Sequence, residues 1–173
     1  MILSYVLAGI AFINCCYYVL FSKFAFATPT KTLQKHTYPI SVIVCAKNEA
    51  ENLSENIPLI LEQTYPNFEL ILINDASSDN TFEVMEKFAE SDTRVKLVNV
   101  KNNEAFWGNK KYALTLGIKK AVNQRLLFTD ADCKPASNKW LEHMTQPLNE
   151  ATQIVLGYGA YKKQKGILRN VFI

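Results

Sequence analysis

The chain begins with a long uncharged apolar run, and short β-branched runs then alternate with segments of helical periodicity. Residues 1–22 contain no Asp, Glu, Lys or Arg. A helix of about 20 such residues, rising about 1.5 Å each, crosses a hydrocarbon core about 30 Å thick. We therefore predict a single transmembrane anchor over residues 1–24, a connector over residues 25–39 and a domain over residues 40–173.

The charges that follow the apolar run predict its orientation. Lys23, Lys31 and Lys35 come after it, and positive residues collect on the cytoplasmic side of a membrane. We therefore expect the N-terminus outside and the domain in the cytoplasm. A cleaved signal peptide is the alternative, because residues 25–27 (Ala-Phe-Ala) are similar to a cleavage site. The run has no basic segment before it and is longer than the apolar part of a signal peptide, which favours the anchor.

Five short apolar runs predict the strands of one β-sheet, at residues 40–46, 68–74, 95–100, 125–129 and 153–156. Helical spacing and polar caps predict helices near residues 49–63, 82–89, 110–122 and 138–144. Pro58 is expected to kink the first of these helices or to make its first turn irregular. Strands that alternate with helices indicate an α/β fold, a parallel sheet with helices on both faces.

Polar side chains gather where the predicted strands end or where the next helix begins. The set is Lys47, Asn48, Glu49, Asn74, Asp75, Asn109, Lys110, Lys111, Asp130 and Asp132. Helix capping is the ordinary explanation for Asn48 and Asp75, and a solvated cation is the ordinary explanation for Lys110. Ligands of parallel sheets bind at the carboxyl ends of the strands. We therefore expect these side chains to converge on one polar ligand site.

The pair Asp130 and Asp132 is the most informative part of this set. On an extended segment, residues at i and i+2 point to the same side, with Ala131 turned away. Two carboxylates this close are costly unless a cation joins them. Their hard oxygen atoms suit Mn²⁺ or Mg²⁺ that bridges a diphosphate. The pair therefore predicts a divalent metal site at the end of the fourth strand.

Composition excludes several classes of protein. A net charge of +3, from 19 Lys and Arg against 16 Asp and Glu, is too small for a nucleic-acid binder. A hydrophobic content of 49% with 6 Gly and 6 Pro excludes a disordered tail or a collagen-like repeat. The four cysteines (Cys15, Cys16, Cys45 and Cys133) lack C-x-x-C spacing, which argues against zinc or a disulfide framework and favours a reducing compartment.

Five ordered motifs carry a resemblance to a known family. They are residues 41–49 with Asn52-Leu53, residues 63–66, residues 69–81, residues 110–114 with Gly117-Ile118, and residues 128–132. Together they resemble the motifs of family 2 glycosyltransferases over residues 40–156. The resemblance implies a GT-A (Rossmann-like) fold, in which helices flank a mostly parallel sheet.

The resemblance also implies a nucleotide-sugar donor and a role for each of four residues. Ala46 and Glu49 would line the nucleoside pocket, with Glu49 towards the ribose. Asp75 would accept a hydrogen bond from the base, which favours uracil and hence a UDP-sugar. Lys110 would contact the nucleotide or its phosphates.

The resemblance further implies a divalent cofactor, Mn²⁺ or Mg²⁺, and inversion at the transferred sugar. Asp132 matches the metal ligand, and Asp130 matches a residue that faces the ribose or a metal-bound water. The acidic general base is expected beyond Ile173, because Glu142 and Glu150 lie in the wrong context. We therefore expect a GT-A domain that is incomplete at its C-terminal end. Residues 157–165 would begin the acceptor side, although their lysines also fit a solvated or lipid-facing loop.

The expected function is the synthesis of a cell-surface glycan or glycolipid by a membrane-anchored transferase, with a nucleotide-sugar donor and a glycan or lipid acceptor. A membrane-tethered nucleotide-sugar-binding pseudoenzyme, or an inactive fragment, is the alternative. A phosphohydrolase of the haloacid-dehalogenase type is disfavoured, because residues 133–135 (Cys-Lys-Pro) follow the acidic pair in place of Gly and Thr. Nucleotidyltransferase (G-x-G-x-R) and dinucleotide-binding (G-x-G-x-x-G) loops are both absent from the sequence.

Overall fold

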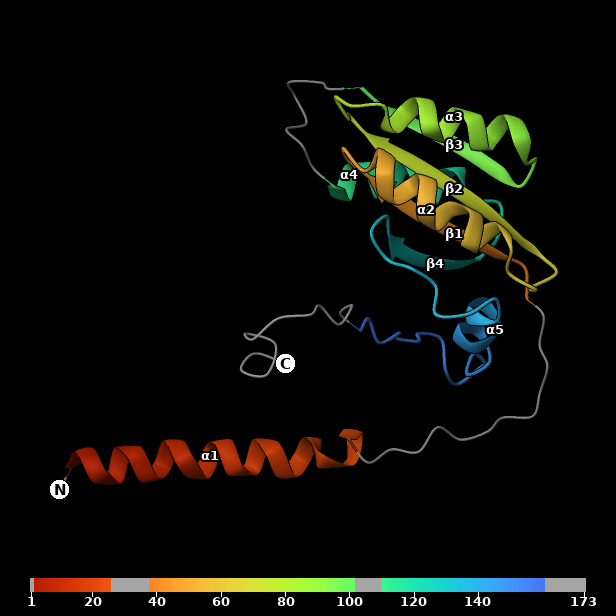
Figure 1. Ribbon diagram of the computed structural model, residues 1–173. Helices are drawn as coiled ribbons and strands as arrows, with labels where there is room; N and C mark the ends of the chain where they lie inside the picture. Colours follow the sequence, from red (N-terminus) through yellow and green to blue (C-terminus); the bar gives the residue numbers. More distant parts are fainter. Residues whose placement is uncertain (1, 26–37, 102–109, 161–173) are drawn as a thin grey trace. The chain divides into compact units, whose positions relative to one another are not determined.

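The computed structural model of the protein describes residues 2–25, 38–101 and 110–160 (Figure 1). The chain divides into two compact units, residues 1–33 and residues 34–173. In the first unit, α1 (Ile2–Ala25) is a helix of 24 residues. Its segment Ile2–Ser22 is long and apolar enough to cross a membrane, a property that signal sequences share. The anchor therefore stays a prediction, and most of the expected connector, residues 26–37, lies outside the described residues.

The second unit alternates strands and helices along the described chain. Its elements are β1 (Ile40–Ala46), α2 (Ala50–Leu61), β2 (Phe68–Asp75), α3 (Thr81–Ser91), β3 (Val95–Val100), α4 (Lys110–Lys120), β4 (Arg125–Asp130) and α5 (Trp140–Thr145). The first four predicted strands are confirmed to within one residue at each end. Pro58 lies inside α2 without ending it, since the Glu62 N–H still donates to the Pro58 carbonyl at 2.9 Å.

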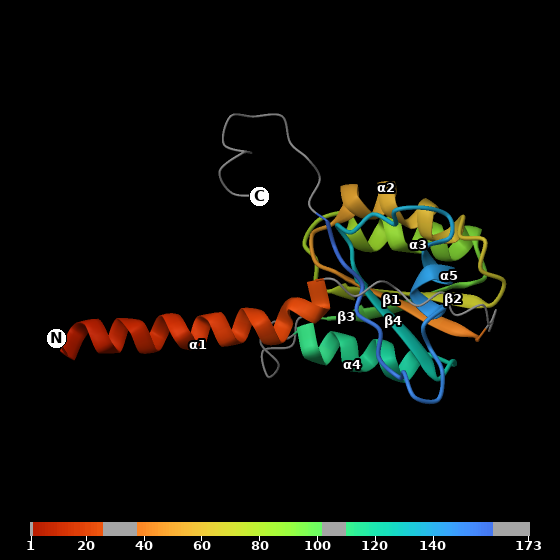
Figure 2. The same ribbon diagram turned by 90° about the horizontal axis from the view of Figure 1, so that it is seen from below.

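The four strands form one parallel sheet in the order β3-β2-β1-β4. Figure 2 shows α2 and α3 on one face of this sheet and α4 on the other, which confirms the predicted α/β architecture. In the register of the sheet, Ala46 of β1 pairs with Asn74 of β2, and Cys45 pairs with Asp130 of β4. The carboxyl ends of β1, β2 and β4 therefore meet at one edge.

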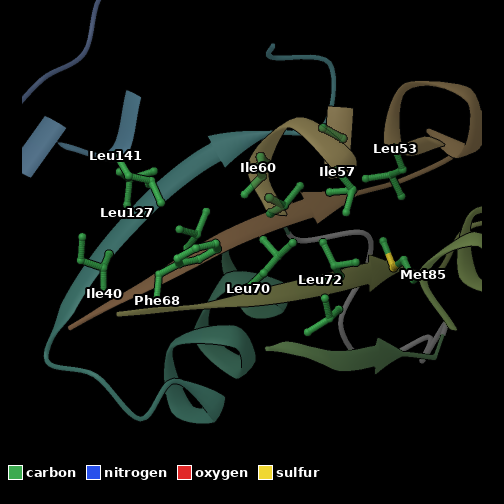
Figure 3. Packing of buried hydrophobic residues seen from close by; sticks show 14 of the residues in the cluster. Ile40, Leu53, Ile57, Ile60, Phe68, Leu70, Leu72, Met85, Leu127 and Leu141 are labelled. Carbon is green, nitrogen blue, oxygen red and sulfur yellow. The ribbon is translucent and has the colours of Figure 1, made fainter. Parts of the chain in front are cut away.

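The hydrophobic core has two parts, one on each face of the sheet, because successive strand residues point to opposite faces. The larger part joins alternate residues of β1 and β2 to α2 and α3, and includes Leu53, Ile57, Leu72 and Met85 (Figure 3). The smaller part packs Ile43, Cys45, Ile71 and Ile73 of the sheet against Ala113 of α4. Both faces of the sheet are thus covered, and its carboxyl edge holds the polar residues.

Helix α4 approaches the sheet closely because it has a glycine at the contact. A Cβ atom built on Gly117 would lie 2.3 Å from Ile73 Cδ1 and 3.1 Å from Ile73 Cγ1. The missing side chain therefore lets the helix axis lie near β2. This placement matters for the site, because Lys110 begins the same helix.

The fifth predicted strand, residues 153–156, is wrong. Residues 152–160 form neither helix nor strand, and Ile154 and Leu156 are 81% and 86% exposed. An apolar run becomes a strand only when a neighbouring strand satisfies its backbone groups. In the described part of the chain β4 pairs only with β1, and no strand extends the sheet beyond it.

Candidate functional site

A pocket of about 320 Å³ opens at the carboxyl edge of the sheet. It is lined by Cys45, Ala46, Lys47, Glu49, Asp75, Lys110, Asp130, Ala131 and Asp132. The sequence order of the strands reverses between β1 and β4, which is where open α/β sheets bind their ligands. All six residues that the sequence assigned to donor or metal binding line this one pocket, and their individual roles stay predictions.

The two loops that follow β1 and β2 are tied to each other through Asn48. Its Oδ1 accepts a hydrogen bond from the Ser78 N–H at 2.8 Å, and its own N–H donates to Ser77 Oγ at 3.1 Å. Asn48 has a φ of 57°, a left-handed conformation that asparagine tolerates better than most residues. Its side chain does not cap α2, whose N-terminal residue Glu49 makes no side-chain cap bond either. The capping explanation is therefore wrong, and Asn48 instead joins two walls of the pocket.

Glu49, at the N-cap of α2, and Asp75, the last residue of β2, both line the pocket with their carboxylates. The Glu49 N–H donates to Thr81 Oγ1 at 2.8 Å, and Glu49 Oε2 accepts from Asn52 Nδ2 at 2.6 Å, which holds the side chain in place. Asp75 is only 8% exposed, and no described residue donates a hydrogen bond to its carboxylate. Asp75 lines the pocket and its ionised carboxylate can only accept, so it suits an N–H or O–H group of a ligand.

The floor of the pocket contains a thiol that stays neutral. Burial, together with the nearby charge of Asp75, raises the pKa of Cys45 to about 11. Thiolates, not thiols, are nucleophiles and metal ligands. Cys45 is therefore a packing residue in the lining of the pocket and not a reactive group.

The acidic pair comes together through a turn, because β4 ends at Asp130 and the Cys133 N–H donates to the Asp130 carbonyl at 3.1 Å. We call residues 130–133 the acidic turn. The predicted extended geometry is wrong for Asp132, although Ala131 is buried and turned away as expected. Side-chain ligand atoms of Asp130, Asp132 and Cys133 all lie within 4.8 Å of one another.

Lys110 lies beside the acidic turn. Its Nζ atom is 2.6 Å from Asp130 Oδ1, and this hydrogen bond raises the pKa of Lys110. Both side chains are more than half exposed to solvent. One carboxylate of the pair is thus neutralised by a lysine while Asp132 is left with its charge, so the turn and Lys110 together suit a divalent cation and an anionic ligand.

The donor atoms of the acidic turn fit Mn²⁺ or Mg²⁺. Two carboxylates supply the hard oxygen ligands that both ions prefer, and the exposed turn leaves room for water or phosphate oxygens. The sulfur of Cys133 adds a softer donor, which the sequence analysis did not foresee. Asp132 and Asp130 are the residues that would hold the ion.

Two buried amides, Asn56 of α2 and Gln63 just after the end of that helix, also reach the region after β4, and neither was predicted to have a role. Asn56 Nδ2 donates to the Ala131 carbonyl at 2.9 Å. Gln63 Nε2 donates to the Ser137 carbonyl at 2.8 Å, and Gln63 Oε1 accepts from the Leu141 N–H at 3.0 Å. Asn56 could have been noticed in the sequence, because it is a polar residue on the apolar face of a predicted helix. Gln63 belongs to a motif of the resemblance, and its contacts dock α5 onto α2.

Some expectations concern residues that the structure does not describe. Asn109 and the lysines of residues 162–165 lie in the ranges 102–109 and 161–173, outside the described residues. The general base expected beyond Ile173 stays a prediction.

Comparison with known proteins defines the class. The family model described as glycosyl transferase family 2 matches residues 41–170, which is most of the chain. The chain therefore belongs to glycosyl transferase family 2.

Individual relatives agree with this family. The chain is 33% identical over 136 residues to an uncharacterized glycosyltransferase of Haemophilus influenzae, covering 75% of the chain and 40% of that protein. It is 33% identical over 129 residues to the glycosyltransferase GlyG of Streptococcus pneumoniae, and this match covers 73% of the chain and 41% of that protein. The chain thus spans about two fifths of the length of these relatives.

A solved structure shows the same fold. The mannosyltransferase PcManGT from Pyrobaculum calidifontis, in complex with GDP-Man and Mn²⁺, superposes with a TM-score of 0.66 at 25% identity. The match covers 82% of this chain and 41% of that one. The four-stranded sheet with its flanking helices is therefore a GT-A fold.

Proposed function

We propose that this chain forms the donor-binding part of a glycosyltransferase that uses a nucleotide-diphosphate sugar. The observation that carries the proposal is the convergence of Glu49, Asp75, Lys110 and the acidic turn in one pocket of about 320 Å³. Acceptors for ribose and base, a cation for phosphate and carboxylates for a metal are the groups such a donor needs. The GDP-Man and Mn²⁺ complex of the mannosyltransferase supports the same donor class.

The nucleoside would bind against Ala46 and Glu49, with Glu49 accepting from the ribose hydroxyls. Asp75 would accept the N3–H of uracil, and we favour a UDP-sugar on this ground. Guanine also presents a ring N–H, and the mannosyltransferase was solved with GDP-Man. A competition titration with UDP and GDP shows which of the two nucleotides the chain prefers.

The diphosphate would lie between Lys110 and the acidic turn. Asp132 and Asp130 would hold Mn²⁺ or Mg²⁺, which when bound neutralises the charge that develops on a diphosphate leaving group. The residues of the chain itself orient the donor: the Lys110 ammonium contacts phosphate oxygens, and the Asn48 contacts keep the two nucleoside-binding loops together.

Transfer to the acceptor would proceed with inversion, with the general base supplied from beyond Ile173. The acceptor would be a glycan or a lipid, and the product part of the cell surface. The apolar helix α1 supports a single-pass anchor. The lysines that follow it in the sequence would place the N-terminus outside and the donor site in the cytoplasm.

Isothermal titration of the chain with UDP tests the proposal. We expect UDP to bind in the presence of Mn²⁺, and Asp132→Ala to weaken this binding at least about 10-fold. Glu90→Ala, which removes an exposed carboxylate from the far helix α3, is the control and should leave it unchanged. Absence of binding, or equal binding by Asp132→Ala, would contradict the proposal.

A further inference from the structure

Helix α2 reaches the acidic turn through Asn56. We propose that Asn56 is a positioning residue that sets the geometry of the Asp130 and Asp132 carboxylates for the metal ion. This inference rests on the proposed function, because it assumes that the acidic turn binds a divalent cation. It adds a residue that touches neither donor nor metal.

The contact itself is buried and its direction is determined. Asn56 is 5% exposed and lies on the face of α2 that also bears Leu53 and Ile57. Its Nδ2 atom is 2.9 Å from the Ala131 carbonyl oxygen, across 75 residues of sequence. A carbonyl oxygen can only accept, so the amide nitrogen must be the atom that faces Ala131.

The contact acts on the residue between the two acids. The acidic turn has a local backbone hydrogen bond from the Cys133 N–H to the Asp130 carbonyl, and Asn56 supplies a tertiary one. The Ala131 side chain is packed in the same core cluster as α2. With its methyl group and its carbonyl both held, the Ala131 backbone cannot rotate without carrying the two flanking carboxylates away from each other.

Metal ligands tolerate little displacement, and groups that hold a ligand in place matter for affinity. Loss of such a supporting partner typically costs about 10- to 100-fold in metal affinity. Without the Asn56 amide, the Ala131 carbonyl would be buried without its partner and the turn would shift towards solvent to satisfy it. The metal site would then be less well formed while the nucleoside pocket stayed in place.

Gln63 provides a matched control just after the end of the same helix. It lies seven residues after Asn56, is buried, and bonds the backbone at Ser137 and Leu141. These contacts lie beyond the acidic turn. Replacement of Gln63 by leucine therefore removes a buried amide and destabilises the fold without releasing residues 130–133.

The experiment compares the native 173-residue chain with Asn56→Leu and Gln63→Leu. The affinity for Mn²⁺ is measured from the electron paramagnetic resonance signal of the free ion, and the affinity for UDP by titration in EDTA. Thermal unfolding followed by circular dichroism shows that each variant is folded at the assay temperature. We expect Asn56→Leu to lose at least about 10-fold in Mn²⁺ affinity and Gln63→Leu less than about twofold, with metal-free UDP binding equal in all three.

Two outcomes would overturn the inference: an unchanged Mn²⁺ affinity in Asn56→Leu, or equal losses in both variants, which would indicate a general effect of destabilisation. If Asn56→Leu does not fold, Asn56→Ala replaces it, because alanine favours the helix, fits within the space of the asparagine and has no group that can donate to Ala131. Failure of the proposed function looks different. In that case the native chain itself binds no Mn²⁺, or Asp132→Ala binds it as tightly as the native chain.

Discussion

Replacement of Lys110 by methionine should change the affinities for metal and for nucleotide in opposite directions. The Lys110 ammonium lies 2.6 Å from Asp130 Oδ1, so it occupies a carboxylate that the metal would also use. Without it, the like charges of Asp130 and Asp132 lose the ammonium that pairs with Asp130, and Mn²⁺ alone should bind more tightly. UDP with Mn²⁺ should bind more weakly, because the cation that faces the phosphates is gone.

The geometry sets the size of both effects. Two unit charges 2.6 Å apart attract by about 1.6 kcal/mol in water. The two side chains are 58% and 61% exposed, and exposed pairs of this kind contribute only about 0.2–1 kcal/mol after screening and entropy. The gain in Mn²⁺ affinity should therefore reach about fivefold at most. A charge-assisted hydrogen bond to phosphate contributes about 1.5–3 kcal/mol, so UDP should lose about 10- to 100-fold.

The assay measures Mn²⁺ binding from the free-ion resonance signal and UDP binding by calorimetry in saturating Mn²⁺. Lys119→Met removes an exposed lysine from the other end of α4 and serves as the control, with both affinities unchanged. A Lys110→Met chain that binds free Mn²⁺ more weakly than the native chain would refute the reasoning. Lys110 would then support the metal site instead of competing for it.

Three further changes are expected to have defined effects. Burial tends to raise the pKa of Glu69, but hydrogen bonds from Lys96 and Ser41 outweigh it and hold the pKa below the ordinary value of 4.5. The stabilisation from Glu69 is therefore complete above pH 4.5 and is lost as the pH falls through the lower folded-state pKa. Below pH 4.5, the free energy of unfolding measured with urea should therefore depend less on pH in Glu69→Gln than in the native chain. Gly117→Val should lower the free energy of unfolding by about 1–3 kcal/mol in the same assay, because its Cβ would clash with Ile73; an unchanged midpoint would show that α4 can move away freely. Cys133→Ser should weaken Cd²⁺ binding about 10-fold and leave Mn²⁺ within about twofold, since sulfur favours softer ions; equal losses for both ions would mean that the thiol is no ligand.

The elements of the fold could be predicted wherever the signal was local. β1 and β2 are buried along their whole length, so their sequences are continuous apolar runs with clear ends. Residues 153–156 have a similar composition and form no strand in the described chain. A strand needs a partner for its backbone groups, and composition does not reveal whether a partner is present.

The residues that form the candidate site could be predicted from the sequence, but their arrangement in space could not. Polar residues after consecutive parallel strands must meet at one edge, which is why Glu49, Asp75 and Asp130 line one pocket. The turn at Asp132 was missed because an extended continuation of β4 had been assumed. The Asn56 contact could not be predicted, because a single polar residue on an apolar helix face has many possible partners.

The sequence by itself determined the apolar N-terminal run, the alternation of strands and helices and the family motifs, because each depends on residues close together in the chain. Only the tertiary structure decided the strand order β3-β2-β1-β4, the turn that brings Asp132 to Asp130, and the distant amide that holds Ala131. These features depend on which surfaces pack together. Packing is a property of the whole domain, so a short stretch of sequence does not specify it.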